Sequence, residues 1–221
     1  MGKTLLLTRS NLRKNRGTSV GLFLLIVIAT CLIGISLLIF IDCYPSVSRE
    51  AVRLNGGDGY ISISGNIEGF TDEKITELVK EDTDRHYTYH DLKLSNHPVK
   101  FGNGEVVISI DISDDSAFKR PMNTFEVITE DTSITENYVY LPYQFNTSGG
   151  FKTGDVFELE NAGKKYSYKV RGFVSVVYGG CNNTALFAIV VDNDSYKKLW
   201  DDTHDEYENI NVIFDLKDGV K

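Results

Sequence analysis

The sequence predicts an α+β fold, in which one N-terminal transmembrane helix is followed by a mixed α+β extracytoplasmic domain that could comprise two subdomains. Three observations lead to this prediction. The run Gly17–Ile41 contains no charged residue, all 31 acidic residues follow Ile41, and strand-like and helix-like segments interleave beyond residue 56. They divide the chain into a cytoplasmic basic segment (1–16), a membrane helix (17–41), a stalk (42–56) and an α+β domain (57–221).

The uncharged run is long enough to cross a bilayer. A hydrocarbon core of about 30 Å needs about 20 residues at a helical rise of about 1.5 Å each, and a single segment in lipid must be helical to satisfy its backbone. A cleaved export signal is the alternative. Its apolar region of about 7–15 residues would end at a small-residue cleavage site, whereas this run is longer and continues into "FIDCYPSVS". An uncleaved anchor explains the run better.

The charges around the run predict its orientation. No acidic residue stands among the basic residues that precede it, which are Lys3, Arg9, Arg13, Lys14 and Arg16. Basic residues beside a span stay in the cytoplasm, so residues 42–221 are expected outside, with a composition too acidic for a nucleic-acid partner. The basic segment can also form an amphipathic helix on membrane lipid; the alternative is that its charges only set the topology.

Small residues recur within the predicted span. Gly17 and Gly21 are four residues apart, as are Thr30 and Gly34. This spacing lets helix backbones approach closely in lipid, although small residues are common in any membrane helix. If the face is used, its partners would be a second copy of this chain or further transmembrane helices.

The remaining residues alternate between strand and helix patterns. Thr71 is the expected N-cap of a helix with an apolar stripe of Ile75, Leu78 and Val79. Further helices are expected over 46–54 and from Asp194 or Ser195 to Trp200. A "GNG" turn at 102–104 precedes one of the strands, which are expected at 60–64, 105–113, 137–142, 156–160, 165–177, 184–191 and 209–216.

Two stretches carry a family resemblance. "YVYLPYQFNTSGGFKTGDVFELENAGKKYSYKVRGFV" resembles the extracytoplasmic domain of FtsX/MacB-type permeases of ATP-binding-cassette systems. In that family a pair like Gly154-Asp155 follows a short helix and begins a hairpin. "LLLTRSNLRKNRGTSVGLFLLIVIAT" is similar to the family's basic lead-in and first membrane helix.

The resemblance implies a permease-type subunit in a bacterial cell membrane. Its outer domain would couple ATP-driven movement of the membrane helices to an exported substrate or external partner, with ATP held by a separate cytoplasmic ATPase subunit. Such permeases return to the membrane after the outer domain, whereas this chain reaches Lys221 just after a strand. It is therefore expected to be either the first part of a longer permease or a single-pass relative. The alternative function is a membrane-anchored sensor or binding module.

Signatures of catalysis are missing from the sequence, so no enzyme activity, cofactor or metal site is expected. Neither a G-x-S-x-G turn nor an H-E-x-x-H motif occurs. His86 and His90 would share a strand face but lie too far apart for one ion, and a solvated pair is expected. The acidic clusters "DISDDS", "DNDS" and "DDTHDE" lack a calcium-loop pattern and are expected to cap helices and aid solubility. An anchored hydrolase is the remaining alternative.

Two further features concern the outer residues. Cys43 and Cys181 could meet outside the cell, but an odd count of three cysteines with Cys31 in the span favours unpaired thiols. The loop 176–185 is a candidate partner surface through Tyr178, Gly179, Gly180, Asn182 and Asn183; the alternative is a plain connection. The tyrosines that alternate along strands are expected in the core: Tyr138, Tyr140, Tyr166 and Tyr168.

Overall fold

A computed structural model describes residues 16–65, 71–161, 163–178, 180 and 186–219. The chain divides into two compact units, Met1–Arg49 and Glu50–Lys221. The predicted surface helix and its residues Lys3, Arg9, Arg13 and Lys14 lie outside the described residues, so they stay predictions.

The described part of the first unit is helical. Helix α2 (Arg16–Arg53) contains a 22-residue stretch, Val20–Ile41, that is long and apolar enough to cross a membrane and has no buried residue. The predicted helix over 46–54 is present as far as Arg53, but it is the end of α2 and not a short helix of its own. Pro45 has no amide N–H to donate, yet the helix continues past it. The last turn of α2, from Glu50 to Arg53, belongs to the second unit.

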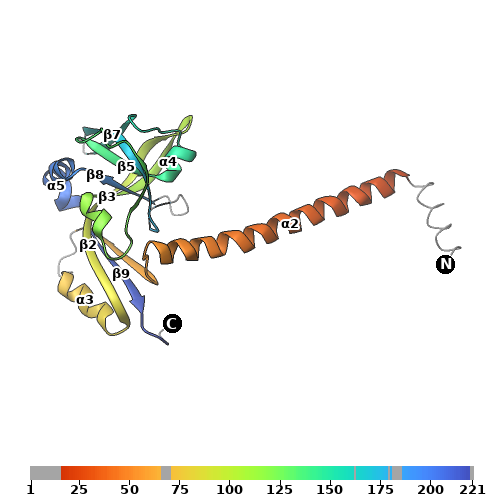
Figure 1. Ribbon diagram of the computed structural model, residues 1–221, viewed down its shortest axis with the longest axis horizontal. Helices are drawn as coiled ribbons and strands as arrows, with labels where there is room; N and C mark the ends of the chain where they lie inside the picture. The colour runs from red at the N-terminus through yellow and green to blue at the C-terminus, as the bar shows by residue number, and fades with distance from the viewer. Residues whose placement is uncertain (1–15, 66–70, 162, 179, 181–185, 220–221) are drawn as a thin grey trace. The chain divides into compact units, whose positions relative to one another are not determined.

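The second unit, called here the α+β domain, has the predicted fold class (Figure 1). Its elements are β1 (Gly59–Ser64), α3 (Asp72–Lys80), β2 (Thr83–Phe101), β3 (Gly104–Ser113), the 3₁₀ helix η1 (Asp115–Lys119), β4 (Glu126–Glu130), β5 (Tyr138–Pro142), α4 (Tyr143–Thr147), β6 (Val156–Asn161), β7 (Lys164–Ser175), β8 (Leu186–Val191), α5 (Asn193–Tyr207) and β9 (Glu208–Leu216). The predicted strands are present, β2 was considered only around His86 and His90, and β4 was not predicted.

The strands form one mixed sheet in the order β1-β9-β2-β3-β8-β5-β7-β4, with β6 paired to β7. The pairs β3–β8 and β5–β7 are parallel and the others antiparallel. The long strand β2 pairs with β9 over Thr83–Leu92 and with β3 from Leu92 to Phe101. Beyond residue 92, β2 contacts β6 through His97, whose Nε2 accepts a hydrogen bond from the Glu160 amide at 2.9 Å.

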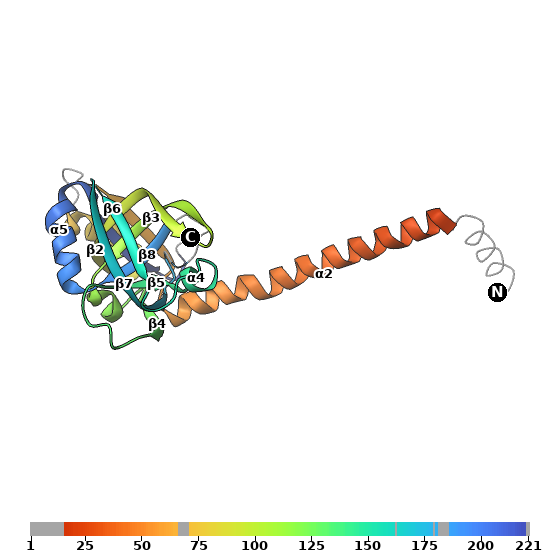
Figure 2. The same cartoon turned by 90° about the horizontal axis from the view of Figure 1, so that it is seen from above.

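The largest apolar core lies where β2, β3, β5, β6, β7 and β8 converge. Phe145 of α4 stands at its centre and contacts the rings of Phe101, Phe157 and Phe187. In Figure 2, α5 lies at the opposite side of the domain from α4, and its Trp200 packs against the same core. The core prediction is confirmed for the tyrosines, all of which are buried: Tyr138, Tyr140, Tyr166 and Tyr168.

The helix caps are partly as predicted. Thr71 caps α3, its hydroxyl accepting from the Lys74 amide at 3.5 Å, and Asp114 caps η1. The prediction for α5 was wrong at both ends. Asp192 is the cap, with a carboxylate that accepts from the Ser195 amide at 3.0 Å, and the helix continues to Tyr207. Since two of the acidic clusters supply caps, their predicted capping role is confirmed for Asp114 and Asp192.

Candidate functional site: the end of helix α2

The last turn of α2 is bonded to the sheet of the α+β domain. Arg53 pairs with Glu50 one turn earlier and with Glu126 at the start of β4. Ser175, the last residue of β7, donates a hydrogen bond to Glu50 Oε1 at 2.6 Å. The hydrogen bonds from Arg53 and Ser175 lower the pKa of Glu50 to about 2. Glu50 is therefore ionised at neutral pH. Through Glu126 and Ser175, the end of the helix contacts both β4 and β7.

The residues that end α2 are held by a second segment, residues 120–125. Leu54 is only 4% exposed, and Asn55 has a φ of +53°, in the left-handed region that ends a helix. The carbonyl of Leu54 accepts from the Thr124 amide at 3.1 Å, and that of Asn55 accepts from the Asn123 amide at 2.8 Å. The Asn55 side chain also donates to the Pro121 carbonyl. Segment 120–125 thus satisfies carbonyls that the helix leaves without partners.

Gly57 lets the chain turn from the end of α2 into β1. Its φ is +70°, and a Cβ at this position would lie 2.7 Å from the Phe214 carbonyl oxygen. We expect Gly57→Ala to lower the free energy of unfolding by about 1–3 kcal/mol, because left-handed strain and a backbone clash add. Unfolding by urea of the full chain in detergent, followed by the fluorescence of Trp200, measures the change.

Gly163→Ala is the matched control for this prediction. Its φ is +75°, but a Cβ there would meet no described atom within 4 Å. It should cost only the left-handed strain of about 1 kcal/mol. Equal destabilisation by the two substitutions would show that the close approach to Phe214 does not matter.

Segment 120–125 also reaches the sheet, through Arg120. This side chain is 5% exposed, and its Nη2 donates to Ser113 Oγ at 2.7 Å. The guanidinium carbon lies 3.7 Å from the centre of the Tyr89 ring, within cation–π range. The same short segment therefore contacts the end of α2 on one side and the sheet on the other.

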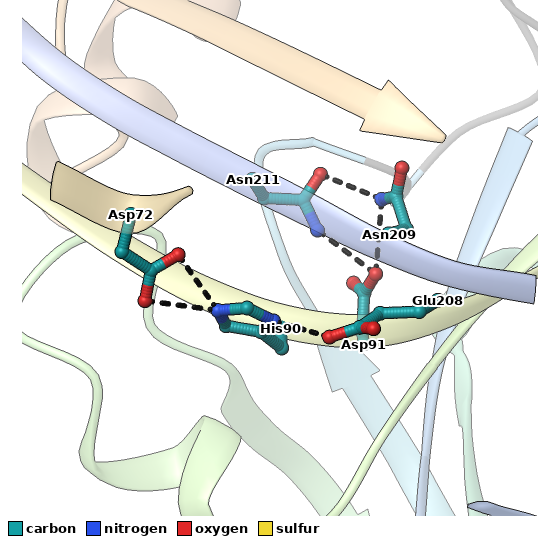
Figure 3. Close-up of polar contacts among 6 residues, drawn as sticks. All are labelled: Asp72, His90, Asp91, Glu208, Asn209 and Asn211. Atoms are coloured by element: carbon teal, nitrogen blue, oxygen red, sulfur yellow. Dashed lines mark hydrogen bonds and ion pairs between the residues drawn. The ribbon is translucent and has the colours of Figure 1, made fainter. Parts of the chain in front are cut away.

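The face of the sheet near Arg120 is buried but polar. Asp91 of β2 is 2% exposed, and its Oδ1 accepts from Asn209 Nδ2 at 3.0 Å and Asn211 Nδ2 at 2.8 Å (Figure 3). Asn211 Oδ1 in turn accepts from Tyr60 at 2.5 Å. Asp111 of β3 is also buried, and its Oδ1 lacks a hydrogen-bond partner among the described residues.

Burial raises the pKa of both aspartates. For Asp91 the pKa rises to about 6, with the two asparagines and Arg120 opposing the rise. For Asp111 burial and the nearby charge of Asp91 both raise the pKa, while Lys93 and Arg120 lower it. Arg120 therefore provides positive charge that favours the ionised forms of two carboxyl groups within the sheet.

The predicted turn at Gly154-Asp155 is present. Gly154 has a φ of +88°, and its amide donates to the Val170 carbonyl at 2.8 Å. Asp155 Oδ2 accepts from the Lys152 amide at 2.8 Å, which closes the turn. The pair follows the short helix α4 and precedes the β6–β7 hairpin, in the order that the resemblance implied.

Other predicted residues are not brought into one site. Tyr178 stacks on Tyr60 with ring centres 4.7 Å apart, so it packs on its own domain. Gly180 is described, whereas Gly179, Cys181, Asn182 and Asn183 lie outside the described residues. Cys31 is exposed and free, and the pairing of the other cysteines stays a prediction.

The small-residue face on α2 also stays a prediction. At Gly17, Gly21 and Gly34 an added Cβ would meet no described atom within 4 Å. The hydroxyl of Thr30 donates to the Ile26 carbonyl at 2.7 Å, which satisfies it within the helix.

His86 and His90 do not form a shared site, and the expectation of a solvated pair was wrong for His90. Both ring nitrogens of His90 lie within hydrogen-bonding distance of carboxylates, from Asp72 and Glu208. Across the part of the chain that the structure describes, no group of His, Cys, Asp and Glu is placed to hold a metal ion.

Six residues at the α2 end and on the buried polar face were not predicted as part of a site: Asn55, Asp91, Asp111, Arg120, Asn209 and Asn211. A signal was present for two of them, since Asn209 and Asn211 are two residues apart in a predicted strand and must share a face. No local pattern placed that face against Asp91, which is 118 residues from Asn209 in sequence.

These features define a class of protein: an α+β domain that follows a helix able to cross a membrane. No family model and no curated protein sequence matches the chain. Among solved structures, it is similar to the periplasmic region of MacB from Actinobacillus actinomycetemcomitans, at 13% identity and a TM-score of 0.38, over 77% of this chain and 79% of that chain.

Two further solved structures show similar values. One is the extracellular domain of the noncanonic ABC-type transporter YknZ from Gram-positive bacteria, at 12% identity and a TM-score of 0.38, over 72% of this chain and 86% of that chain. The other is a putative lipoprotein from Bacillus anthracis, at 16% identity and a TM-score of 0.38, over 72% and 84%. The function proposed below therefore rests on the residues of this chain.

Proposed function

We propose that the chain is a permease-type subunit of an ATP-binding-cassette transporter, with residues 42–221 outside a bacterial cell membrane. The observation that carries the proposal is helix α2, in which the apolar stretch Val20–Ile41 and the bonded last turn belong to one helix. A helix that starts in lipid and ends in hydrogen bonds to β4, β7 and segment 120–125 suits a subunit that passes movement from the membrane to an outer domain.

The proposal assigns ATP hydrolysis to a separate cytoplasmic ATPase subunit. This chain would bind no cofactor and catalyse no reaction; it would act by contact with an exported substrate or an external partner. The basic residues before the span would lie at the inner membrane surface, near anionic lipid and the ATPase. Small residues on the span would pack against a second permease copy or further transmembrane helices.

The orientation can be tested by labelling. In a variant without the native cysteines, Leu78→Cys places a reporter on an exposed side chain of α3, and Gly2→Cys places one before the span. We expect a membrane-impermeant maleimide to label residue 78 in intact cells and residue 2 only after permeabilisation. Changing Arg9, Arg13, Lys14 and Arg16 to Glu should reduce or reverse this difference, because the basic residues set the topology. Protection of residue 78 in intact cells would overturn the proposed orientation.

The partner can be tested by purification in mild detergent. We expect an ATP-binding-cassette ATPase to be retained by the full chain and lost when residues 1–16 are deleted. The matched control is Lys152→Ala, in an exposed turn of the α+β domain, which should retain the ATPase. If the full chain retains no ATPase, the alternative of a membrane-anchored sensor or binding module is favoured.

A further inference from the structure

We propose that His90 is a pH-sensitive latch that fastens the first turn of α3 to strands β2 and β9. The latch is closed when the imidazole carries a proton on both nitrogens and opens when it loses one. This is a property of the α+β domain, so it goes beyond the transport role proposed above and does not depend on an ATPase.

The geometry requires both ring protons. His90 Nδ1 lies 2.7 Å from Glu208 Oε1, and His90 Nε2 lies 3.0 and 3.1 Å from the two carboxylate oxygens of Asp72 (Figure 3). Ionised carboxylates only accept hydrogen bonds, and a neutral imidazole has a single N–H to donate. A neutral ring would therefore direct a lone pair at one of the two carboxylates, and only imidazolium satisfies both contacts.

The latch joins three elements that are far apart in sequence. Asp72 is the first residue of α3, His90 lies in the middle of β2, and Glu208 is the first residue of β9. Apart from this contact, α3 is held by two buried side chains, Ile75 and Val79, which pack with Val212 and with the partly buried Ile63, Ile210 and Phe214. At its C-terminal end the Thr83 hydroxyl donates to the Val79 carbonyl at 2.8 Å. The hydrogen bond from Thr83 lies at the C-terminal end of α3, whereas the contact with His90 fastens its first residue, Asp72.

Other charged groups near His90 pair among themselves or point away. On α5, Lys197 pairs with Asp201 at 2.9 Å, and both line a groove with His90 and with Asp114, which caps η1. His86 lies on the same face of β2, four residues before His90, and Asp91 points to the opposite face (Figure 3). The charges that contact the ring are therefore the two carboxylates.

The pH range follows from the environment of the ring. Partial burial alone would lower the pKa of His90, but hydrogen bonds with Glu208 and Asp72 outweigh this and raise the pKa above its usual value. A histidine whose pKa is higher when folded stabilises the folded form below its ordinary pKa of about 6.5. That stabilisation is lost as the pH rises through the raised value, so the latch opens towards alkaline pH.

Hydrogen exchange of the full chain in lipid nanodiscs tests the latch. The readout is the protection of the peptide 72–80 at pH 6 and pH 8.5, corrected for the intrinsic exchange rate, with peptides from β5 and β8 as a reference for the intact fold. After this correction, we expect the amide hydrogens of α3 to exchange about fivefold faster at pH 8.5 than at pH 6, because one charge-assisted contact is lost.

Two variants separate the latch from a general effect of pH. In His90→Gln, α3 should be weakly protected at both pH values, because Gln does not titrate. In the matched control His86→Gln, the wild-type dependence on pH should remain. Equal protection of wild-type α3 at the two pH values, or the same pH dependence in His90→Gln, would overturn the proposal; a fast-exchanging reference in β5 and β8 would place the change in the whole domain and would also overturn it.

Discussion

Replacing Phe145 by alanine is expected to lower the free energy of unfolding of the α+β domain by about 3–5 kcal/mol. Phe145 is fully buried, and its ring contacts those of Phe101, Phe157 and Phe187 at centre distances of 5.4, 6.0 and 4.9 Å. The contacts come from β2, β6 and β8, so the cavity left by the substitution would be lined by several elements that cannot all relax into it.

The measurement is urea unfolding of the full chain in detergent. Trp200 is the only tryptophan and belongs to the α+β domain, so its fluorescence reports the unfolding of this domain rather than of the span. Tyr143→Ala is the control, because Tyr143 is on the same helix and 40% exposed. It should change the free energy of unfolding by no more than about 0.5 kcal/mol. Similar losses from both substitutions would contradict the central position of Phe145.

The second large effect is expected for Arg120→Met, which keeps most of the side-chain volume but removes the charge. We expect a loss of about 3 kcal/mol in the free energy of unfolding at pH 8. The substitution removes a charged hydrogen bond to Ser113 and a buried cation–π contact with Tyr89. It also leaves Lys93 as the remaining positive charge that lowers the pKa of Asp91 and Asp111.

The loss should depend on pH. Arg120 lowers the pKa of both aspartates, so its removal raises them further. Groups with a raised pKa in the folded state stabilise that state when protonated, and this stability is lost as the pH rises through the raised values. The destabilisation by Arg120→Met should therefore be smaller at pH 5 than at pH 8, and Asp111→Asn should recover part of it at pH 8 in the double variant.

Arg85→Met is the matched control for Arg120→Met. Arg85 also contacts the end of α2, through a 2.7 Å hydrogen bond to Asn55, but its side chain is half exposed and pairs with Asp215 at the surface. Its removal should lower the free energy of unfolding by about 1 kcal/mol or less, and this loss should be the same at pH 5 and at pH 8. If Arg120→Met behaves like Arg85→Met, the buried polar face does not depend on Arg120.

Much of the fold could be predicted from local patterns. The length and apolar character of Gly17–Ile41 predicted the helix, Thr71 predicted the start of α3, and alternating residues predicted β1, β3 and β9. Strand β2 was missed because its second half changes partner from β9 to β3 and carries polar residues on both faces. From sequence alone, a polar side chain such as Asp91 is predicted to be exposed, because its hydrogen-bond partners are distant in sequence and unknown.

The candidate site was less predictable for the same reason. Asn55 and Arg120 are joined to the helix end and to the sheet by contacts between residues far apart in sequence. The N-cap of α5 could not be predicted either, because a contact distant in sequence decides it. Asp192, Asp194 and Ser195 are all suitable N-cap residues, and Asp192 is selected because its second oxygen accepts from the Tyr138 amide of β5 at 2.9 Å.

The order of strands has a consequence for biosynthesis. Within the described residues β1 pairs with β9 alone, and β9 also supplies the partner for the first half of β2. A ribosome makes residues 59–64 long before residues 208–216, so β1 stays unpaired, with its backbone hydrated, while the intervening residues are translated. This edge of the sheet therefore forms only after β9 has been synthesised, and until then the unpaired strand is exposed to aggregation.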